Sequence, residues 1–214
     1  MKQLTFEEMN RIILERVPLE ERLKAVYLPI IAMDCACYLS DDLLAVMGAA
    51  KLDCTKKLSR IIRDYVQMYR DDNKRVMHSN LYENLTQSTR AFYNSLSQNM
   101  LIHKVQYRQA MLDRGLSFDE NVTQMVALAY IIRKLVRFVV ELDREFSSKI
   151  SCLLGSGINY TTEDNRCCIE LEKALTQMLD ALSVSQFDLE NSNTEMAFKV
   201  FQNKLHTVKI WLHK

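Results

Sequence analysis

The chain has 214 residues, a formal net charge of +1, and only 4 glycines and 2 prolines. Folds built from short strands need a turn about every 8–12 residues, and turns use Gly and Pro, so this composition excludes a strand-rich fold. It favours a few long helices. The near-zero net charge also excludes an overall field that would attract nucleic acid or an anionic membrane, so such a partner would need a local patch.

A capping box opens the first predicted helix. The Thr5 hydroxyl and the Glu8 carboxylate can each accept a hydrogen bond from a backbone amide that lacks a partner in the first helical turn. We therefore expect a helix over about 6–16. It should end at Val17, because the residue before Pro18 avoids helical dihedral angles.

Two further short helices are expected in the N-terminal region. Pro18 suits the first turn of a helix that runs to about residue 39. Pro29 should kink or restart this helix, because proline lacks the amide hydrogen that a helix interior uses. Ser40 can then cap a helix over 41–49. These helices would pack across the rest of the chain and form an N-terminal subdomain over 1–50.

The stretch from Leu52 to Arg114 contains no Gly and no Pro. A single helix of that length would run to roughly 90 Å, which is too long for a compact domain. We expect a break at Asp71-Asp72-Asn73 or at Asn80, because Asn80 and Glu83 form a second, looser capping box.

The clearest turn signal in the chain lies between residues 113 and 120. Gly115 can end one helix, and Ser117 with Glu120 three residues later can cap the next. This pattern predicts a tight turn between two long antiparallel helices. Gly155 should end the second of these helices. The expected helices in this part of the chain cover about 80–114, 118–154, 163–184 and 194–213.

Apolar residues recur every three to four positions along these segments, which is typical of amphipathic helices. In the last expected helix they are Ala197, Phe201, Leu205, Val208 and Leu212. Antiparallel neighbours with such stripes pack as a bundle. The sequence therefore predicts an all-α single domain over 1–214. We expect an up-and-down bundle of four or five long helices over 51–214, with the shorter N-terminal helices packed across it.

A row of basic residues is the best candidate for a binding site. They lie between 56 and 74 and are Lys56, Lys57, Arg60, Arg63, Arg70 and Lys74, and all except Lys57 recur at helical spacing on one face. One helix face carrying these cations can bind several phosphates at once. Together with the short helix over 41–49, the basic helix has the outline of a helix-turn-helix DNA-reading motif, although Lys57 falls where that motif needs an apolar residue. A solvated helix face is the favoured interpretation.

Metal-binding patterns are missing from the sequence. Helical di-iron proteins use Glu-x-x-His pairs, and none of the four histidines has Glu three residues before it. We expect these histidines to be exposed or at helix ends; they are His78, His103, His206 and His213. The pairs Cys35-x-Cys37 and Cys167-Cys168 lack zinc-site spacing and should diverge on a helix. No metal and no cofactor is expected.

Asp34 is the one candidate for an acid or base catalyst, because it lies in an apolar run where burial would shift its pKa. A buried carboxylate is more often satisfied by a Tyr hydroxyl or an Arg, and we favour that interpretation. The N-terminus shows no signal peptide and no apolar run is long enough to span a bilayer, so we expect a cytoplasmic chain without membrane contact.

Three functional hypotheses remain open. The first is a non-enzymatic protein-interaction or regulatory module that uses an exposed apolar stripe, either for a protein partner or for self-association. The second is a nucleic-acid-binding regulator that uses the basic helix over 56–74. The third is an enzyme whose site is assembled inside the bundle, with Asp34 as a candidate residue. The lack of catalytic motifs favours the first.

Overall fold

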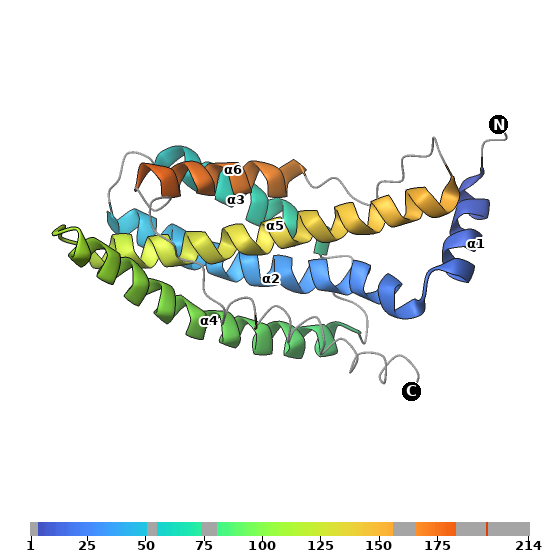
Figure 1. Ribbon diagram of the computed structural model, residues 1–214, viewed down its shortest axis with the longest axis horizontal. Helices are drawn as coiled ribbons and strands as arrows, with labels where there is room; N and C mark the ends of the chain where they lie inside the picture. The colour runs from blue at the N-terminus through green and yellow to red at the C-terminus, as the bar shows by residue number, and fades with distance from the viewer. Residues whose placement is uncertain (1–3, 51–54, 74–80, 156–165, 183–195, 197–214) are drawn as a thin grey trace.

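The computed structural model describes residues 4–50, 55–73, 81–155, 166–182 and 196 (Figure 1). Every secondary-structure element in these ranges is a helix, which confirms the all-α prediction for this part of the chain. None of the described helices combines the length and the apolar character needed to cross a lipid bilayer. The helices are α1 (Phe6–Arg16), α2 (Leu19–Ala50), α3 (Thr55–Asn73), α4 (Leu81–Asp113), α5 (Glu120–Leu154) and α6 (Arg166–Ala181).

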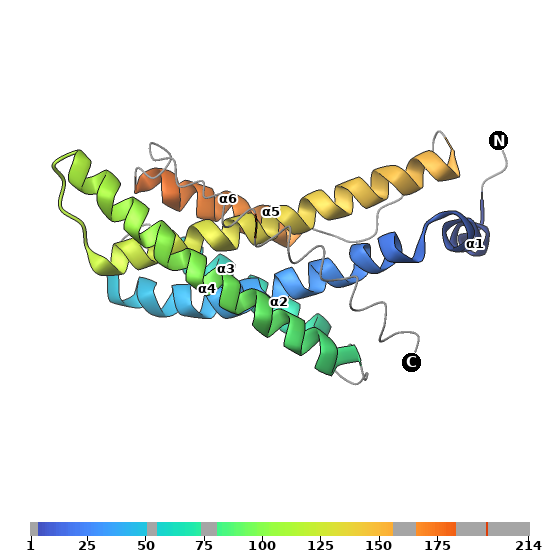
Figure 2. The same cartoon turned by 60° about the horizontal axis from the view of Figure 1, so that its bottom comes forward.

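The centre of the molecule is α5. It packs along α2, and it also contacts α4 and α6, while α3 packs against α6 (Figure 1). In the turned view of Figure 2, α4 crosses in front of α2 and α5. Every residue from Met125 to Ile132 is buried, as expected for a helix segment that is apolar on all sides. The uninterrupted apolar run in the sequence thus marks the helix with most neighbours.

One hydrophobic core contains side chains from all five helices α2, α3, α4, α5 and α6. Side chains from each of these helices are completely buried in it, among them Leu39, Ile62, Leu96, Leu135 and Leu175. A second, smaller cluster joins α1 to the C-terminal end of α5 through Ile13, Val17, Ile150 and Leu154. The capping box of α1 is confirmed: the Thr5 amide donates to Glu8 Oε2 at 2.8 Å, and the Glu8 amide donates to Thr5 Oγ1 at 3.2 Å.

A single helix, α2, stands where two were expected. The predicted separate helix over 41–49 is wrong, and Ser40 is a buried residue inside α2 instead of a cap. The reason is tertiary: Leu39, Leu43 and Met47 are buried in the core at helical spacing on both sides of Ser40. Burying that continuous apolar face outweighs the local capping preference of one serine. Pro29 also lies within α2.

The turn between α4 and α5 was predicted correctly except for its cap. Gly115 adopts φ 67° and its amide bonds to the Leu112 carbonyl at 2.9 Å, in the left-handed conformation that favours glycine. The predicted Ser117 cap is wrong. Asp119 caps α5 instead, accepting from the Val122 amide at 3.0 Å, because Asp caps at least as well as Ser. Gly155 ends α5 as expected.

Two other predicted boundaries can be compared with the structure. Of the two expected break points, Asp71-Asp72-Asn73 lies inside α3, and Asn80 lies outside the described residues. The helix expected over 163–184 corresponds to α6. The Asn80 capping box and, apart from Met196, the helix expected over 194–213 lie outside the described residues.

Candidate functional site

The predicted basic residues whose side chains the structure describes are exposed on α3. The inner face of this helix is buried in the core through Leu58, Ile62 and Tyr65. Arg60 Nε lies 3.9 Å from Asp64 in a pair that is almost fully exposed. Lys56, Lys57, Arg60 and Arg63 are all exposed, while the Arg70 side chain and Lys74 lie outside the described part of the chain. The structure therefore brings four of the six predicted cations together; below they are called the α3 basic face.

The helix-turn-helix outline is wrong. That motif needs a short helix and a turn directly before the basic helix. In the structure α2 continues without interruption to Ala50, and Gly48 lies inside it. Any nucleic-acid contact by the α3 basic face would therefore have to work through phosphates, without the geometry that presents a recognition helix to the major groove.

A feature that the sequence analysis missed is the outer side of α4. Its inner side is buried through Phe92, Leu96 and Tyr107, yet Leu101, Val105 and Leu112 are 60%, 60% and 55% exposed. Their spacing places these three on one stripe opposite the core, where a surface helix is normally polar. Leu116 and Phe118 are also exposed in the following turn. We call these five exposed side chains the α4 outer stripe.

The charges beside this stripe are engaged within the chain. Arg108 donates to both carboxylate oxygens of Glu120, and Lys104 Nζ lies 3.3 Å from Glu120 Oε1. The Arg108 guanidinium also lies 5.8 Å from the centre of the Phe118 ring. The hydrogen bond from Arg108 is the main reason why the pKa of Glu120 is below its usual value. Both cations are therefore held by one carboxylate at the edge of the stripe, whose own side chains are apolar.

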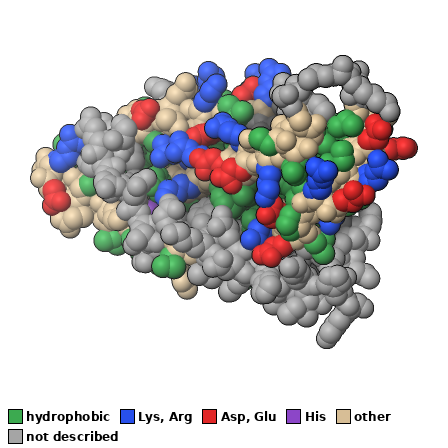
Figure 3. Space-filling model, turned by 45° about the vertical axis from the view of Figure 1, so that its right-hand side comes forward, with side chains coloured by type: hydrophobic (Ala, Val, Ile, Leu, Met, Phe, Trp, Pro, Cys, Tyr) green, Lys and Arg blue, Asp and Glu red, His purple; other side chains and the backbone are tan. Residues whose placement is uncertain are grey.

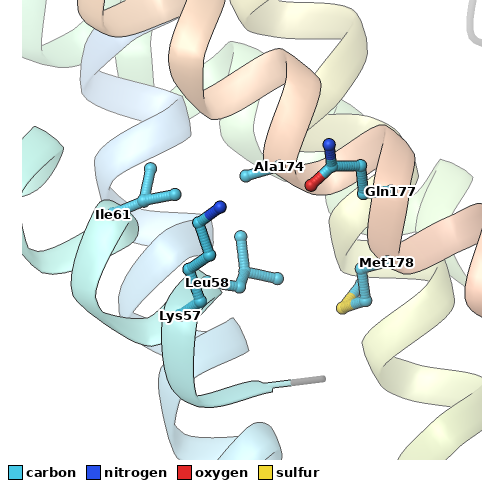
Figure 4. A pocket seen from close by; sticks show the side chains of 6 residues that line it. All are labelled: Lys57, Leu58, Ile61, Ala174, Gln177 and Met178. Carbon is cyan, nitrogen blue, oxygen red and sulfur yellow. The ribbon is translucent and has the colours of Figure 1, made fainter.

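A small pocket of about 130 Å³ opens between α3 and α6 (Figure 4). Its walls are mostly apolar, and its polar groups come from Lys57 and Gln177. In Figure 4 the Lys57 side chain extends over the pocket, with its amine pointing away from its own backbone. The lining residues are Lys57, Leu58 and Ile61 of α3, and Ala174, Gln177 and Met178 of α6.

Farther along the same two helices the gap is closed. Cys167 Sγ of α6 lies 3.3 Å from Met68 Sδ of α3. Since Lys57 faces Gln177 at the pocket and Met68 faces Cys167 here, α3 and α6 run antiparallel. The pocket is therefore a local opening in an otherwise packed helix pair.

His103 contradicts the expectation of an exposed or helix-end histidine. Its side chain is fully buried between α4 and α5, with its ring centre 4.7 Å from that of Tyr130 in an edge-on arrangement. Its Nδ1 lies 3.2 Å from Gln106 Oε1. Phe92, Leu96 and Asn99 lie on the same buried seam, so helical spacing, followed past the polar Asn99, would have placed His103 in the core. The other three histidines lie outside the described residues.

Nothing in the described residues adds support for catalysis around Asp34. This residue is half-buried on α2, and the pocket between α3 and α6 is not lined by it. Burial, and then the neighbouring Asp34 and Cys37, raise the pKa of the Cys35 thiol far above its ordinary value, so it stays protonated and weakly nucleophilic.

The cysteines of α6 diverge as predicted. Cys167 contacts Met68 on α3, whereas Cys168 Sγ lies 3.6 Å from Met33 Sδ on α2. Within the described part of the chain, no three His, Cys, Asp or Glu side chains are grouped so that they can hold a metal ion. The sulfur atoms here therefore pack between helices as small apolar groups do.

Charges of opposite sign alternate over the surface seen in Figure 3. Two ion pairs also join different helices: Lys149 of α5 pairs with Glu21 of α2, and Arg137 of α5 pairs with Glu172 of α6 at 2.7 Å. This face offers no large field of one sign, in keeping with the net charge of +1.

Comparison of the chain with protein-family models, curated proteins and solved structures finds no match. Three surfaces of the chain bear on its function: the α3 basic face, the α4 outer stripe and the pocket between α3 and α6. Sequence reasoning found the first and missed the other two, because both depend on which face of a helix its neighbours leave uncovered.

Proposed function

We propose that the chain is a non-enzymatic protein-interaction module, built as an up-and-down helical bundle, and that the α4 outer stripe is its partner surface. The observation that carries the proposal is the second apolar face of α4. Leu101, Val105 and Leu112 remain more than half exposed although the opposite side of the same helix is packed in the core. Leaving bulky apolar side chains in water is unfavourable, and their alignment along one stripe suits the docking of another helix.

The size of the stripe fits the centre of an interface. Fully burying one Leu or Phe removes roughly 60–120 Å² of apolar surface from water, so five half-exposed side chains supply roughly 150–300 Å². A stable interface buries about 800 Å² on each side. The partner must therefore surround the stripe with further contacts, which is the usual relation between a few anchor residues and their rim. We propose an amphipathic helix of a second protein as the occupant.

Site-specific photo-crosslinking in cells that express the chain tests this proposal. A photoreactive amino acid replaces Val105 on the stripe or, as a control, the exposed Arg144 on α5. We expect one discrete crosslinked partner from position 105 and not from 144, and its loss when Leu101 and Leu112 are changed to Ser.

Two results would redirect the proposal. A crosslinked product with twice the mass of the chain would identify self-association as the role of the stripe, and light scattering of the purified protein would check it. Identical products from positions 105 and 144 would remove the proposal, because they would show that the stripe has no preferred partner.

A second candidate function is supported by the α3 basic face. Its four cations are exposed on one helix, so they can reach phosphates. Four phosphate contacts predict a log–log salt slope of about −3.6 for binding to duplex DNA. Reversing Lys56, Arg60 and Arg63 to Glu should abolish binding, whereas reversing the exposed Arg11, Arg16 and Arg144 should not. If both triple variants lose DNA binding equally, the binding reflects the overall charge of the chain and not the α3 basic face.

A further inference from the structure

The pocket between α3 and α6 has the size of one apolar side chain. A cavity of roughly 150 Å³ lined by Leu, Ile and Phe is large enough to hold benzene, and this pocket measures about 130 Å³. Leu58, Ile61 and Met178 give it an apolar wall. The contact of Met68 with Cys167 lies farther along the same helix pair, so the opening does not extend along its whole length.

Lys57 is the one charged residue among the described lining residues of the pocket. It extends over the opening (Figure 4), whereas Lys56, Arg60 and Arg63 are exposed on the solvated side of the same helix. On the same two helices, Asp64 lies 3.9 Å from Arg60 and Glu170 lies 3.3 Å from Arg166, so these two carboxylates have basic partners on their own helices. A ligand that places a carboxylate beside Lys57 gains a charge-assisted hydrogen bond that a neutral ligand cannot make.

We infer that this pocket binds a bulky apolar side chain from an acidic helical segment of another protein, with Lys57 pairing with a carboxylate of that segment. The site lies on a different surface from the α4 outer stripe, so it goes beyond the function proposed above. The Gln177 side chain can add one hydrogen bond to the same segment, since its amide both donates and accepts.

The lining favours a peptide over a nucleic acid. Single-stranded nucleic acids are held by aromatic side chains on which bases stack, and none of the six described lining residues is aromatic. A phosphate group would gain nothing from Leu58, Ile61 or Met178, which make up the wall. The apolar wall and the Lys57 amine are used together only by a ligand that carries both an apolar group and a negative charge.

Methyl NMR on the 214-residue chain tests the inference directly. The probe is a short synthetic Ala/Glu helix with one central Leu, and the matched probe has Ala in place of that Leu. We expect the Leu peptide to shift the methyl signals of Leu58, Ile61 and Met178, and the Ala peptide to bind at least about fivefold more weakly, since three buried carbons are lost.

Two variants on the same helix separate a specific contact from general attraction. Lys57→Gln should weaken binding of the Leu peptide about fivefold to tenfold, because a charge-assisted hydrogen bond is lost. Lys56→Gln removes the same charge one position away, on the fully solvated side of α3, and should change binding less than twofold. Ala174→Leu should fill the pocket and abolish binding, with an unchanged thermal unfolding midpoint showing that the fold is retained.

Several outcomes would overturn the inference. They are unshifted pocket methyls at saturating peptide, equal binding of the Leu and Ala peptides, and equal effects of Lys56→Gln and Lys57→Gln. A duplex DNA titrated in parallel should leave the pocket methyls unshifted. If it shifts them as strongly as the Leu peptide does, the site belongs to nucleic acid. None of these results affects crosslinking from Val105, so the two proposals can fail separately.

Discussion

Two Leu→Ala substitutions on neighbouring helices distinguish the core of this protein from its proposed partner surface. Leu135 of α5 is fully buried, whereas Leu112 of α4 is 55% exposed. The two substitutions delete the same atoms from a helical position. Any difference in their effect on the free energy of unfolding therefore reports how each side chain is surrounded in the folded chain.

The expected difference is large. Removing a buried Leu side chain costs about 3–5 kcal/mol, because apolar burial is lost and a cavity remains. Changing the exposed Leu112 to Ala should lower the free energy of unfolding by at most about 0.5 kcal/mol, as is usual for surface positions. We take the free energy of unfolding to fall by about 2 kcal/mol for each molar of urea. Leu135→Ala should then lower the urea concentration at the unfolding midpoint by about 1.5–2.5 M, and Leu112→Ala by less than about 0.3 M.

Urea unfolding followed by circular dichroism measures both midpoints. A cost for Leu112→Ala close to that of Leu135→Ala would refute the reasoning, because it would show that the α4 outer stripe is covered within the folded chain. The stripe would then be core, and the interaction surface proposed for it would be lost. A small cost at both positions would instead contradict the packing of α5.

Three further perturbations test single features of the fold. Gly115→Ala should destabilise the chain by about 1 kcal/mol because its φ is positive, whereas Gly48→Ala inside α2 should stabilise it by about 0.5–1 kcal/mol; thermal unfolding of both variants checks the opposite signs. His103→Ala should cost at least about 2 kcal/mol by emptying a buried site against α5, and a near-neutral effect in urea unfolding would place the ring outside the core. For Glu120 the folded pKa is lowered, so its contribution is present above the usual 4.5 and disappears as pH falls through the lower folded value. The stability gap between wild type and Glu120→Gln, followed from pH 7 down to pH 3, should therefore close in acid; a gap that is constant with pH would show that the pair with Arg108 contributes nothing.

Features that depend on a few adjacent residues were predictable from the sequence. The capping box of Thr5 and Glu8, the left-handed Gly115 and the end of α5 at Gly155 all lie where local chemistry places them. The α3 basic face was predictable too, because it follows from helical spacing alone. Local rules failed where two of them competed: Asp119 took the cap expected at Ser117.

The sequence by itself determined that the described chain is helical and where most helices begin and end, because hydrogen bonding and capping act within one or two turns. Only the tertiary structure decided which helix faces are covered. Ser40 and His103 became buried, Leu101 and Val105 stayed exposed, and Lys57 came to the edge of a pocket shared with α6. Each of these outcomes depends on which distant helix packs against a given side, and periodicity along one helix does not specify its neighbours.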